Sequence, residues 1–330
     1  MSSSQPLAIA LSIAKTLNAD IFLYRGAIDR TGYQKITKLC RTTTPRRNAL
    51  LLLSTYGGDA HAAYRIARAL RHNYEKLFVL IPAECKSAGT LIAIGASELI
   101  ICDCGELGPL DVQITKPDEM FERSSGLDVM QSLVVMQNEA LETFRSYLLD
   151  IKLGSGITLK AAAEIATKLA VGLFSPIYEQ IDPVKLGETQ RAIAIAHAYG
   201  ERLNKYDKNL SNGALGKLVS DYPSHGFVID RKEARELFRC VRAPTDEEAK
   251  LVASLYNAKN TELDGPPMVV DIVDALSARE EKNDKTGKRN PESTSGAAGS
   301  SAGVEQVEPT GQRTGTKRNR RAKEVPAPRR

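Results

Sequence analysis

Three short apolar segments, each followed by small residues, limit what this chain can fold into more than any other feature. Residues 48–54 lead into Gly57-Gly58-Asp59, and a helical pattern follows. Residues 77–81 lead into Ser87-Ala88-Gly89-Thr90 and a second, shorter helical pattern. A third apolar segment covers residues 98–102. Strands that end in small residues and open helices expose backbone N–H groups, so the pattern predicts an α/β protein with a site at these junctions.

Ser87 is the candidate nucleophile at the second junction. A serine hydroxyl needs a base and hydrogen-bond donors for the oxyanion that forms when it attacks a carbonyl. The N–H of Ala88 at a helix start and the N–H of Gly58 on a neighbouring strand are the candidate donors. The alternative is structural: Ser87 caps a helix, and Gly57-Gly58 makes a tight turn.

Three motifs stand in the order and at about the spacing found in the Clp/crotonase-fold serine peptidases: residues 55–59 (TYGGD), 86–90 (KSAGT) and 106–113 (ELGPLDVQ). More narrowly, they resemble the serine dehydrogenase proteinase family, and the similarity extends more weakly to about residue 242. The resemblance implies a Clp/crotonase-like spiral of ββα units, to which the later helical patterns add a helical C-terminal layer.

The same resemblance implies that Ser87 is the nucleophile and that Gly58 and Ala88 form the oxyanion hole. Val112 stands where the family pattern has proline. In the Clp peptidases a histidine lies in the segment that corresponds to residues 108–113. Here Asp111 is the nearest residue, and a carboxylate is a poor base for serine unless its pKa is raised, so Asp111 is assigned to orienting the base.

The general base is therefore sought among the four histidines, His61, His72, His197 and His225. His225 is the best placed, because it lies in a loop just before a strand-like Phe-Val-Ile sequence. His61 lies near the first junction, whereas His72 and His197 lie on polar or surface positions of helices.

A Ser–Lys dyad is the alternative, since related peptidases of this fold use one. Lys152, Lys160 and Lys168 lie at compatible distances along the chain, and a lysine base must be desolvated. Lys86 points away from Ser87 if the segment is extended. Cys85 is an alternative nucleophile that ranks below the serine.

The remaining pattern alternates strand and helix early and becomes mostly helical later. Helices are expected at residues 5–18, 120–152, 158–173, 184–206, 211–221, 231–241 and 245–259. Residues 19–26 and the segment near 33–38 are expected to form either two strands or a strand followed by a helix. Pro176 and Pro183 are assigned to a loop. The apolar stripe of the 120–152 helix belongs either to the core or to a contact with another subunit.

Composition changes at about residue 280. Residues 280–330 contain no Leu, Ile, Phe, Tyr, Met or Trp and carry the net charge of the entire chain, +5. Such a segment cannot bury a core, so we expect a peptidase domain at 1–279 and a disordered basic tail at 280–330. The basic run 317–323 has the composition of a segment that contacts nucleic acid or an acidic partner, and the alternative is a tail that only keeps the chain soluble.

No segment approaches the length of a membrane span, the first residues lack a signal-peptide pattern, and five scattered cysteines do not form a disulfide framework. We therefore expect a cytoplasmic location, no cofactor and no metal site.

Three functions fit these observations. The first is an ATP-independent serine endopeptidase that acts on peptides or proteins, in a homo-oligomer. The second is a non-catalytic oligomeric scaffold of the same fold. The third is a crotonase-like acyl-CoA enzyme, which needs no serine at position 87. A Walker motif is absent, so any ATP-driven unfoldase is a separate chain.

Overall fold

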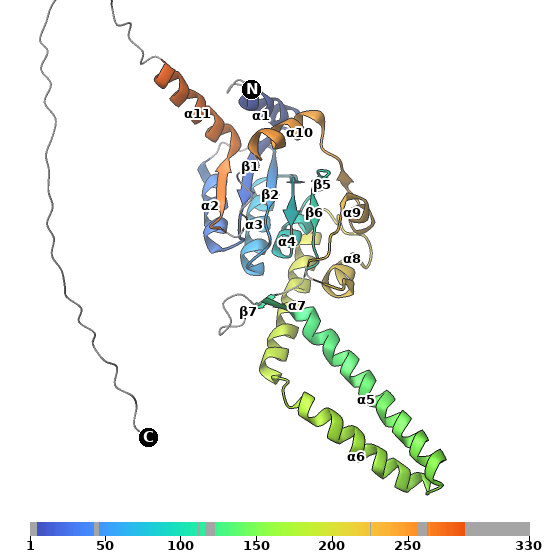
Figure 1. Cartoon of the computed structure of the whole chain (residues 1–330). Coiled ribbons are helices and arrows are strands. Elements are labelled where there is room, and N and C mark those ends of the chain that lie inside the picture. Colours follow the sequence, from blue (N-terminus) through green and yellow to red (C-terminus); the bar gives the residue numbers. More distant parts are fainter. Residues whose placement is uncertain are drawn as a thin grey trace, which may run out of the picture. The chain divides into compact units, whose positions relative to one another are not determined.

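A computed structural model describes residues 5–42, 46–110, 113–115, 123–224, 226–256, 263 and 265–287. Its central sheet has the strand order β10-β1-β2-β3-β5-β9 (Figure 1). These strands are β10 (Met268–Asp271), β1 (Ala19–Arg25), β2 (Asn48–Ser54), β3 (Leu77–Ile81), β5 (Glu98–Ile101) and β9 (Val241–Arg242).

The strands from β1 to β9 pair in parallel, and only β10 runs antiparallel, on the outer side of β1. The central strands are apolar along almost their entire length and buried. Parallel strands covered on both faces have this composition, because neither face meets water. The carboxyl ends of the parallel strands consequently share one edge of the sheet.

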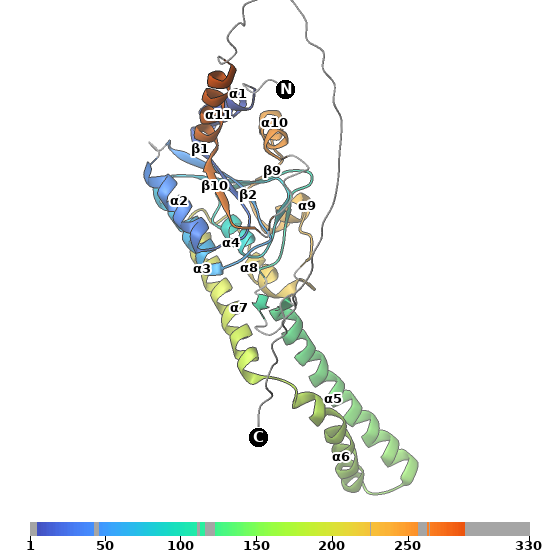
Figure 2. The ribbon, with the colours of Figure 1, turned by 60° about the vertical axis from the view of Figure 1, so that its left-hand side comes forward.

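Helices cover both faces of the sheet, and alternate strand residues point into two separate cores. One core joins Phe22, Leu51 and Val79 to α2 (Arg30–Thr42), α3 (Ala60–Asn73) and α4 (Ala88–Ile94). The other joins strand residues such as Leu50 and Leu80 to α1 (Gln5–Thr16), α10 (Asp246–Leu255) and α11 (Ile272–Gly287). Figure 2 shows α1, α10 and α11 together on one side of the sheet and α2, α3 and α4 on the other.

Shorter elements extend the sheet edge where the site is expected. Two short strands, β4 (Glu84–Cys85) and β6 (Glu106–Leu107), pair in parallel. A separate antiparallel pair is formed by β7 (Gln113–Thr115) and β8 (Arg123–Ser125). On the chain's later part, α8 (Ala214–Gly216), a π-helical turn (Lys217–Asp221) and α9 (Arg231–Leu237) complete the first core.

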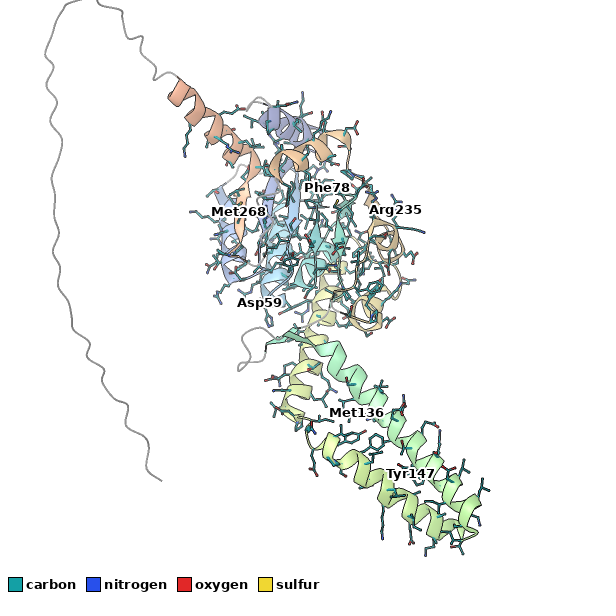
Figure 3. The ribbon with its side chains drawn as sticks, in the orientation of Figure 1. Asp59, Phe78, Met136, Tyr147, Arg235 and Met268 are labelled. Atoms are coloured by element: carbon teal, nitrogen blue, oxygen red, sulfur yellow. The ribbon has the colours of Figure 1, made fainter. Side chains whose placement is uncertain are left out.

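Two long helices, α5 (Gly126–Ser155) and α6 (Leu159–Tyr178), pack on each other as a hairpin that extends away from the sheet in both views. Tyr147 lies between the two helices in Figure 3. The side of α6 that is buried is a stripe of alanines: Ala162, Ala166 and Ala170. Thr158 caps α6, its side-chain oxygen accepting from the N–H of Ala161. The chain continues into α7 (Pro183–Asn204), which contacts α3, α4 and α5.

The α/β prediction is confirmed. Residues 33–38 lie inside the helix α2, which agrees with the strand-plus-helix alternative. The loop assignment of the two prolines is wrong, because Pro176 lies in the last turn of α6 and Pro183 is the first residue of α7. The later part of the chain is mostly helical, as predicted, but β9 and β10 form the two edges of the sheet. Both strands are short and their outer sides are partly exposed, so no alternating apolar pattern marks them.

The chain divides into two compact units, Met1–Thr286 and Gly287–Arg330. The boundary expected at 279/280 falls within α11, and the domain assignment stays a prediction. The basic run 317–323 lies outside the described residues. In the part of the chain that the structure describes, no helix is long and apolar enough to cross a membrane.

Candidate active site

The first two strand–helix junctions lie side by side at the carboxyl edge of the sheet. Thr55 and Cys85 form a parallel bridge beyond the ends of β2 and β3. The N–H of Thr55 donates to the Glu84 carbonyl at 2.8 Å, and the N–H of Lys86 donates to the Thr55 carbonyl at 3.0 Å. Figure 3 shows this edge at Asp59, where α3 begins, opposite the edge marked by Phe78 in β3. The Gly57-Gly58 and Ser87-Ala88 segments are therefore neighbours.

Ser87 has a backbone conformation that serines rarely adopt, with φ at +49° and ψ at −111°. It stands directly before α4, yet its side chain makes no capping hydrogen bond to that helix. The structural alternative, in which Ser87 serves as an N-cap, is therefore not supported. Residues held in sparsely populated backbone regions cost about 1–3 kcal/mol each and gather at active sites. A sharp, strained strand-to-helix turn is also what presents a nucleophilic serine in other hydrolases.

Gly57 makes room for Ser87. A Cβ atom placed on Gly57 would lie 2.9 Å from the Cβ of Ser87 and 3.2 Å from the Lys86 carbonyl oxygen. Gly57 also has a φ of +115°, which side chains rarely tolerate. Its turn is fixed by Thr55, whose hydroxyl oxygen accepts from the Gly57 N–H at 2.9 Å. No side chain can stand at this position without displacing Ser87.

The direction of the Gly58 N–H follows from the neighbouring peptide group. The Gly57 carbonyl accepts from the N–H of Ile28, on the β1 side of β2. In a trans peptide the C=O and the following N–H point in opposite directions, and the chain has no cis peptide bond. The Gly58 N–H therefore points away from Ile28, toward the side of β2 on which Ser87 lies.

The N–H of Ala88 is a second donor at this place, because the first N–H groups of a helix have no partner within the helix. Within the described residues, neither the Gly58 N–H nor the Ala88 N–H has a hydrogen-bond partner. The site thus combines a partly exposed serine with two backbone donors and the amino end of a helix.

Asp111 and His225 lie outside the described residues, but the segments that lead to them are held close to Ser87. Thr90, in α4, donates its hydroxyl to the Gly108 carbonyl at 2.7 Å. The N–H of Leu110, the residue before Asp111, donates to the Leu218 carbonyl at 2.8 Å.

The segment after His225 contacts β6 and Lys86. Leu107 and Ile229 form an antiparallel bridge, with N–H to carbonyl distances of 2.9 and 3.0 Å. Phe227, two residues after His225, accepts from the Lys86 ammonium through its carbonyl. Phe227 and Ile229 therefore both contact residues next to Ser87 in the sequence or in β6.

The other histidines belong elsewhere. His61 is exposed on α3, and its Nδ1 lies 2.8 Å from the Tyr199 hydroxyl of α7. His197 is exposed, with its Nδ1 3.7 Å from a carboxylate oxygen of Glu201. His72 is exposed at the end of α3.

The three alternative lysines all belong to the α5–α6 hairpin. Lys152 donates to the Ile157 carbonyl at 2.7 Å, at the connection between the two helices. Lys160 and Lys168 are exposed on α6. Figure 1 shows this hairpin leaving the sheet, so the structure does not bring these lysines to Ser87 within one chain.

Cys85 is completely buried, and burial raises the pKa of its thiol far above the ordinary value. A neutral, inaccessible thiol is not a nucleophile. Within the residues described, no cluster of three or more His, Cys, Asp or Glu side chains is arranged to hold a metal ion.

One charged pair beside Ser87 was not anticipated from the sequence. The Lys86 ammonium lies 2.6 Å from Glu106 Oε1. In the sequence, Lys86 and Glu106 each stand next to a buried residue, and this is the only hint of the pair. The two residues are twenty positions apart, so their contact depends on how β4 and β6 pair, which the sequence does not give.

Comparison with known proteins identifies relatives. A family model described as a ClpP-like SDH-type serine proteinase matches residues 19–186, just over half of the chain. That range includes Gly58, Ser87 and Ala88 and ends before His225.

Two uncharacterized proteins of Methanocaldococcus jannaschii are similar in sequence. The first is 30% identical over 155 residues, which cover 44% of this chain and 52% of its own length. The second is 33% identical over 81 residues, covering 24% of this chain and 28% of its own length. The chain therefore spans about half the length of the first and less than a third of the second.

Among solved structures, the 1510-N membrane-bound stomatin-specific protease, in a serine-to-alanine mutant form, matches with a TM-score of 0.28 and 15% sequence identity. That match covers 46% of this chain and 69% of the other.

Proposed function

The chain belongs to the family of ClpP-like SDH-type serine proteinases, and we propose that it is itself a serine endopeptidase that uses Ser87 as its nucleophile. The observation that carries the proposal is the conformation of Ser87. The residue is held at positive φ between a strand and α4, it makes no capping bond, and Gly57 leaves the space beside it.

The proposed reaction is acyl transfer. Ser87 Oγ attacks the carbonyl carbon of a peptide bond while the base takes its proton. The carbonyl oxygen becomes an oxyanion, which accepts from the N–H groups of Gly58 and Ala88. The C–N bond then breaks, and the leaving amine receives the proton from the base. Water attacks the acyl-enzyme in the second half of the cycle and restores the serine.

Two features support the assignment of the oxyanion donors. The Gly58 N–H points away from Ile28, on the Ser87 side of β2, and the Ala88 N–H opens α4. Fixed donors of this kind need no reorganisation as charge develops, and removing one typically costs about 100- to 1,000-fold in rate.

His225 is proposed as the base and Asp111 as the group that orients it. In support, both neighbouring segments contact residues close to Ser87 in the sequence. The hydroxyl of Thr90, in α4, donates to the Gly108 carbonyl, and the Lys86 ammonium donates to the Phe227 carbonyl. The described lysine alternatives Lys152, Lys160 and Lys168 lie on the hairpin and compete only if a second subunit supplies them.

A peptide or protein is the proposed substrate, and no cofactor enters the proposed reaction, because every step uses only the chain's own groups and water. The non-catalytic scaffold remains the alternative. It predicts the same fold but an unreactive Ser87.

A fluorophosphonate probe separates the two functions, because it reacts only with an activated serine. We expect covalent labelling of the full chain, with the adduct located on Ser87 by peptide mass spectrometry, and no labelling of Ser87→Ala. Ser87→Ala should remain folded, since Ser87 contributes no capping bond. An unlabelled wild-type chain with a normal unfolding transition would instead identify the scaffold.

A further inference from the structure

Lys86 precedes Ser87, and its side chain is almost completely buried, with 7% of the residue exposed. Its ammonium group has three partners. It lies 2.6 Å from Glu106 Oε1, and it donates to the carbonyl oxygens of Phe227 at 3.2 Å and Leu107 at 3.4 Å. A buried charge is retained only where it is paired and hydrogen-bonded, and these contacts use all three donors of the ammonium.

The backbone of Lys86 is bound on the opposite side. Its N–H donates to the Thr55 carbonyl at 3.0 Å, and its carbonyl accepts from Gly89 at 2.8 Å. Lys86 thus contacts Thr55 after β2, the start of α4, β6 and the segment that contains Phe227.

The side chain is also packed tightly along its length. A Cβ atom on Gly108 would lie 2.6 Å from Lys86 Cδ and 3.3 Å from Lys86 Cβ. Gly108 therefore leaves a channel through which the lysine stem passes to Glu106. Beyond Gly108 the chain continues through Leu110 to Asp111, and the segment that contains Phe227 begins next to His225.

We propose that Lys86 is a positioning residue: its ammonium ties β6 and the segment that begins at Phe227 to the turn that presents Ser87. Along the chain these two segments adjoin the proposed Asp111 and His225. This inference rests on the proposed function, because it concerns the assembly of the same site. We do not assign Lys86 as the general base. Its three donors are all engaged, so it has no lone pair with which to accept the serine proton.

The test compares Lys86→Met, which keeps the length of the stem and removes the charge, with the wild-type chain. The rate constant of fluorophosphonate labelling at saturating probe and the apparent probe affinity are measured separately. We expect the rate constant to fall at least tenfold and the apparent affinity to change less than about threefold, because misplacing a catalytic group by about 1 Å costs up to 100-fold in rate.

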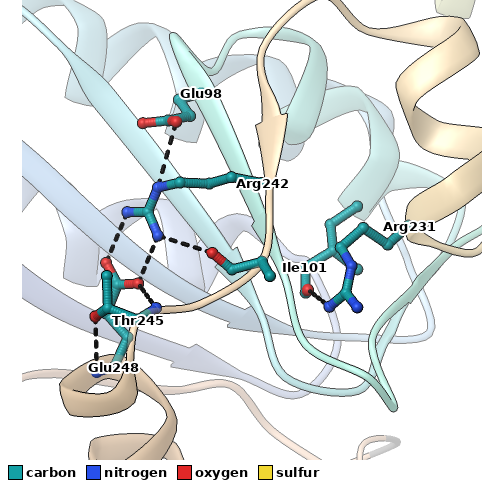
Figure 4. A network of polar contacts seen from close by, with 7 residues as sticks. Glu98, Ile101, Arg231, Arg242, Thr245 and Glu248 are labelled. Atoms are coloured by element: carbon teal, nitrogen blue, oxygen red, sulfur yellow. Dashed lines mark hydrogen bonds and ion pairs between the residues drawn. The ribbon is translucent and has the colours of Figure 1, made fainter.

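The matched control is Arg242→Met. Arg242 is partly exposed and also forms an ion pair with a buried carboxylate: it donates to Glu248 at 2.6 and 2.8 Å and lies 3.3 Å from Glu98 (Figure 4). Glu98 begins β5, at the edge of the sheet opposite to Ser87. Arg242→Met should lower the unfolding midpoint and leave the labelling rate constant of the folded protein unchanged.

A second readout does not depend on activity. The N–H groups of Leu107 and Ile229, which bond each other's carbonyls, report whether the two segments stay together. In Lys86→Met their hydrogen exchange should accelerate at least tenfold relative to the Leu51 and Leu52 amides of β2. In Arg242→Met this ratio should not change.

If Lys86→Met does not fold, Glu106→Gln takes its place, because it keeps the shape and the acceptor and removes only the opposite charge. Glu106→Gln should also lower the labelling rate constant and accelerate hydrogen exchange at the Leu107 and Ile229 amides. Labelling of the folded lysine variant at the wild-type rate constant, or an equal loss in Arg242→Met, would overturn the inference. If the wild-type chain is not labelled at Ser87, the proposed function has failed, and the exchange ratio alone decides whether Lys86 holds the segments together.

Discussion

Gly57 lies directly against Ser87: a Cβ added to Gly57 would be 2.9 Å from the serine Cβ and 3.4 Å from its hydroxyl oxygen. Separations under 3.0 Å essentially never occur for real Cβ atoms, so either Ser87 or the glycine turn must move. We therefore expect Gly57→Ala to lower the rate of fluorophosphonate labelling at least 100-fold. Because φ is +115° at this position, we also expect a loss of about 1–3 kcal/mol in the free energy of unfolding.

Gly213→Ala is the control for this prediction. Gly213 also has positive φ, at +77°, but nothing lies within 4 Å of the position of its Cβ. The variant should lose about 1 kcal/mol of unfolding free energy and label at the wild-type rate. Equal labelling of the folded Gly57→Ala and Gly213→Ala proteins would show that the contact with Ser87 has no catalytic consequence.

The base is tested by His225→Ala. A protonated imidazole cannot accept the serine proton, so wild-type activity should fall as the pH drops through a pKa near 6–7. His225→Ala should reduce the turnover of a peptide substrate by about 100- to 10,000-fold. His197→Ala, which removes an exposed histidine beside Glu201, should have no effect.

A lysine base gives the opposite pattern. His225→Ala would then be mild, and one of Lys152→Ala, Lys160→Ala and Lys168→Ala would abolish turnover. Since these lysines lie on the α5–α6 hairpin, activity would also depend on protein concentration, as a second subunit would have to supply the group.

The ion pair between Arg242 and the buried carboxylate of Glu248 predicts an acid-sensitive contribution to stability. Burial opposes ionisation of Glu248, which is 2% exposed, but the hydrogen bonds from Arg242 and Thr245 outweigh it, and its pKa is lowered from the ordinary 4.5. A group with a lowered folded-state pKa stabilises the protein above its unfolded-state pKa, and the contribution is lost as the pH falls through the folded-state value.

We therefore expect Glu248→Gln to lower the free energy of unfolding by about 1–3 kcal/mol at pH 7. The difference from wild type should shrink as the pH is lowered below about 4.5, measured by urea unfolding at each pH. A difference that stays constant down to pH 2 would show that the charge of Glu248 does not contribute.

The α5–α6 hairpin exposes large apolar side chains, of which Leu153 is 81% exposed and Leu169 50%. Surfaces of this kind mark contacts with other chains. We expect the chain to form a homo-oligomer through this hairpin. Leu169→Lys with Leu173→Lys should lower the mass measured by light scattering, whereas Thr167→Lys on the same helix should not. A wild-type chain that stays monomeric at about 50 µM would contradict this prediction.

Local sequence predicted the centre of the fold well. The strands before Gly57 and Ser87 are continuous apolar segments, and the residues after them are small, so both their position and their role as junctions could be read from the chain. The edge strands β9 and β10 could not be predicted from local sequence. β10 owes its conformation to antiparallel pairing with β1, more than 240 residues earlier, and carries no pattern of its own.

The contacts of the candidate site, like the edge strands, depend on residues far apart in the sequence. The positive φ of Ser87 is imposed by the turn between β4 and α4 and by the space at Gly57, whereas serine alone prefers negative φ. The bond from Thr90 to Gly108 and the pair of Lys86 with Glu106 depend on the register between β4 and β6. Short-range patterns therefore pointed to Ser87 as the candidate nucleophile, but not to the contacts that hold its surroundings.

Whether Ser87 is an activated nucleophile is decided by the site at which a fluorophosphonate attaches to the full chain. We expect one adduct per chain, on the peptide that contains Ser87. The adduct should be absent when the protein is unfolded in urea before the probe is added, and absent in Ser87→Ala. An adduct on another residue, or none on a chain shown to be folded, would contradict the assignment of Ser87.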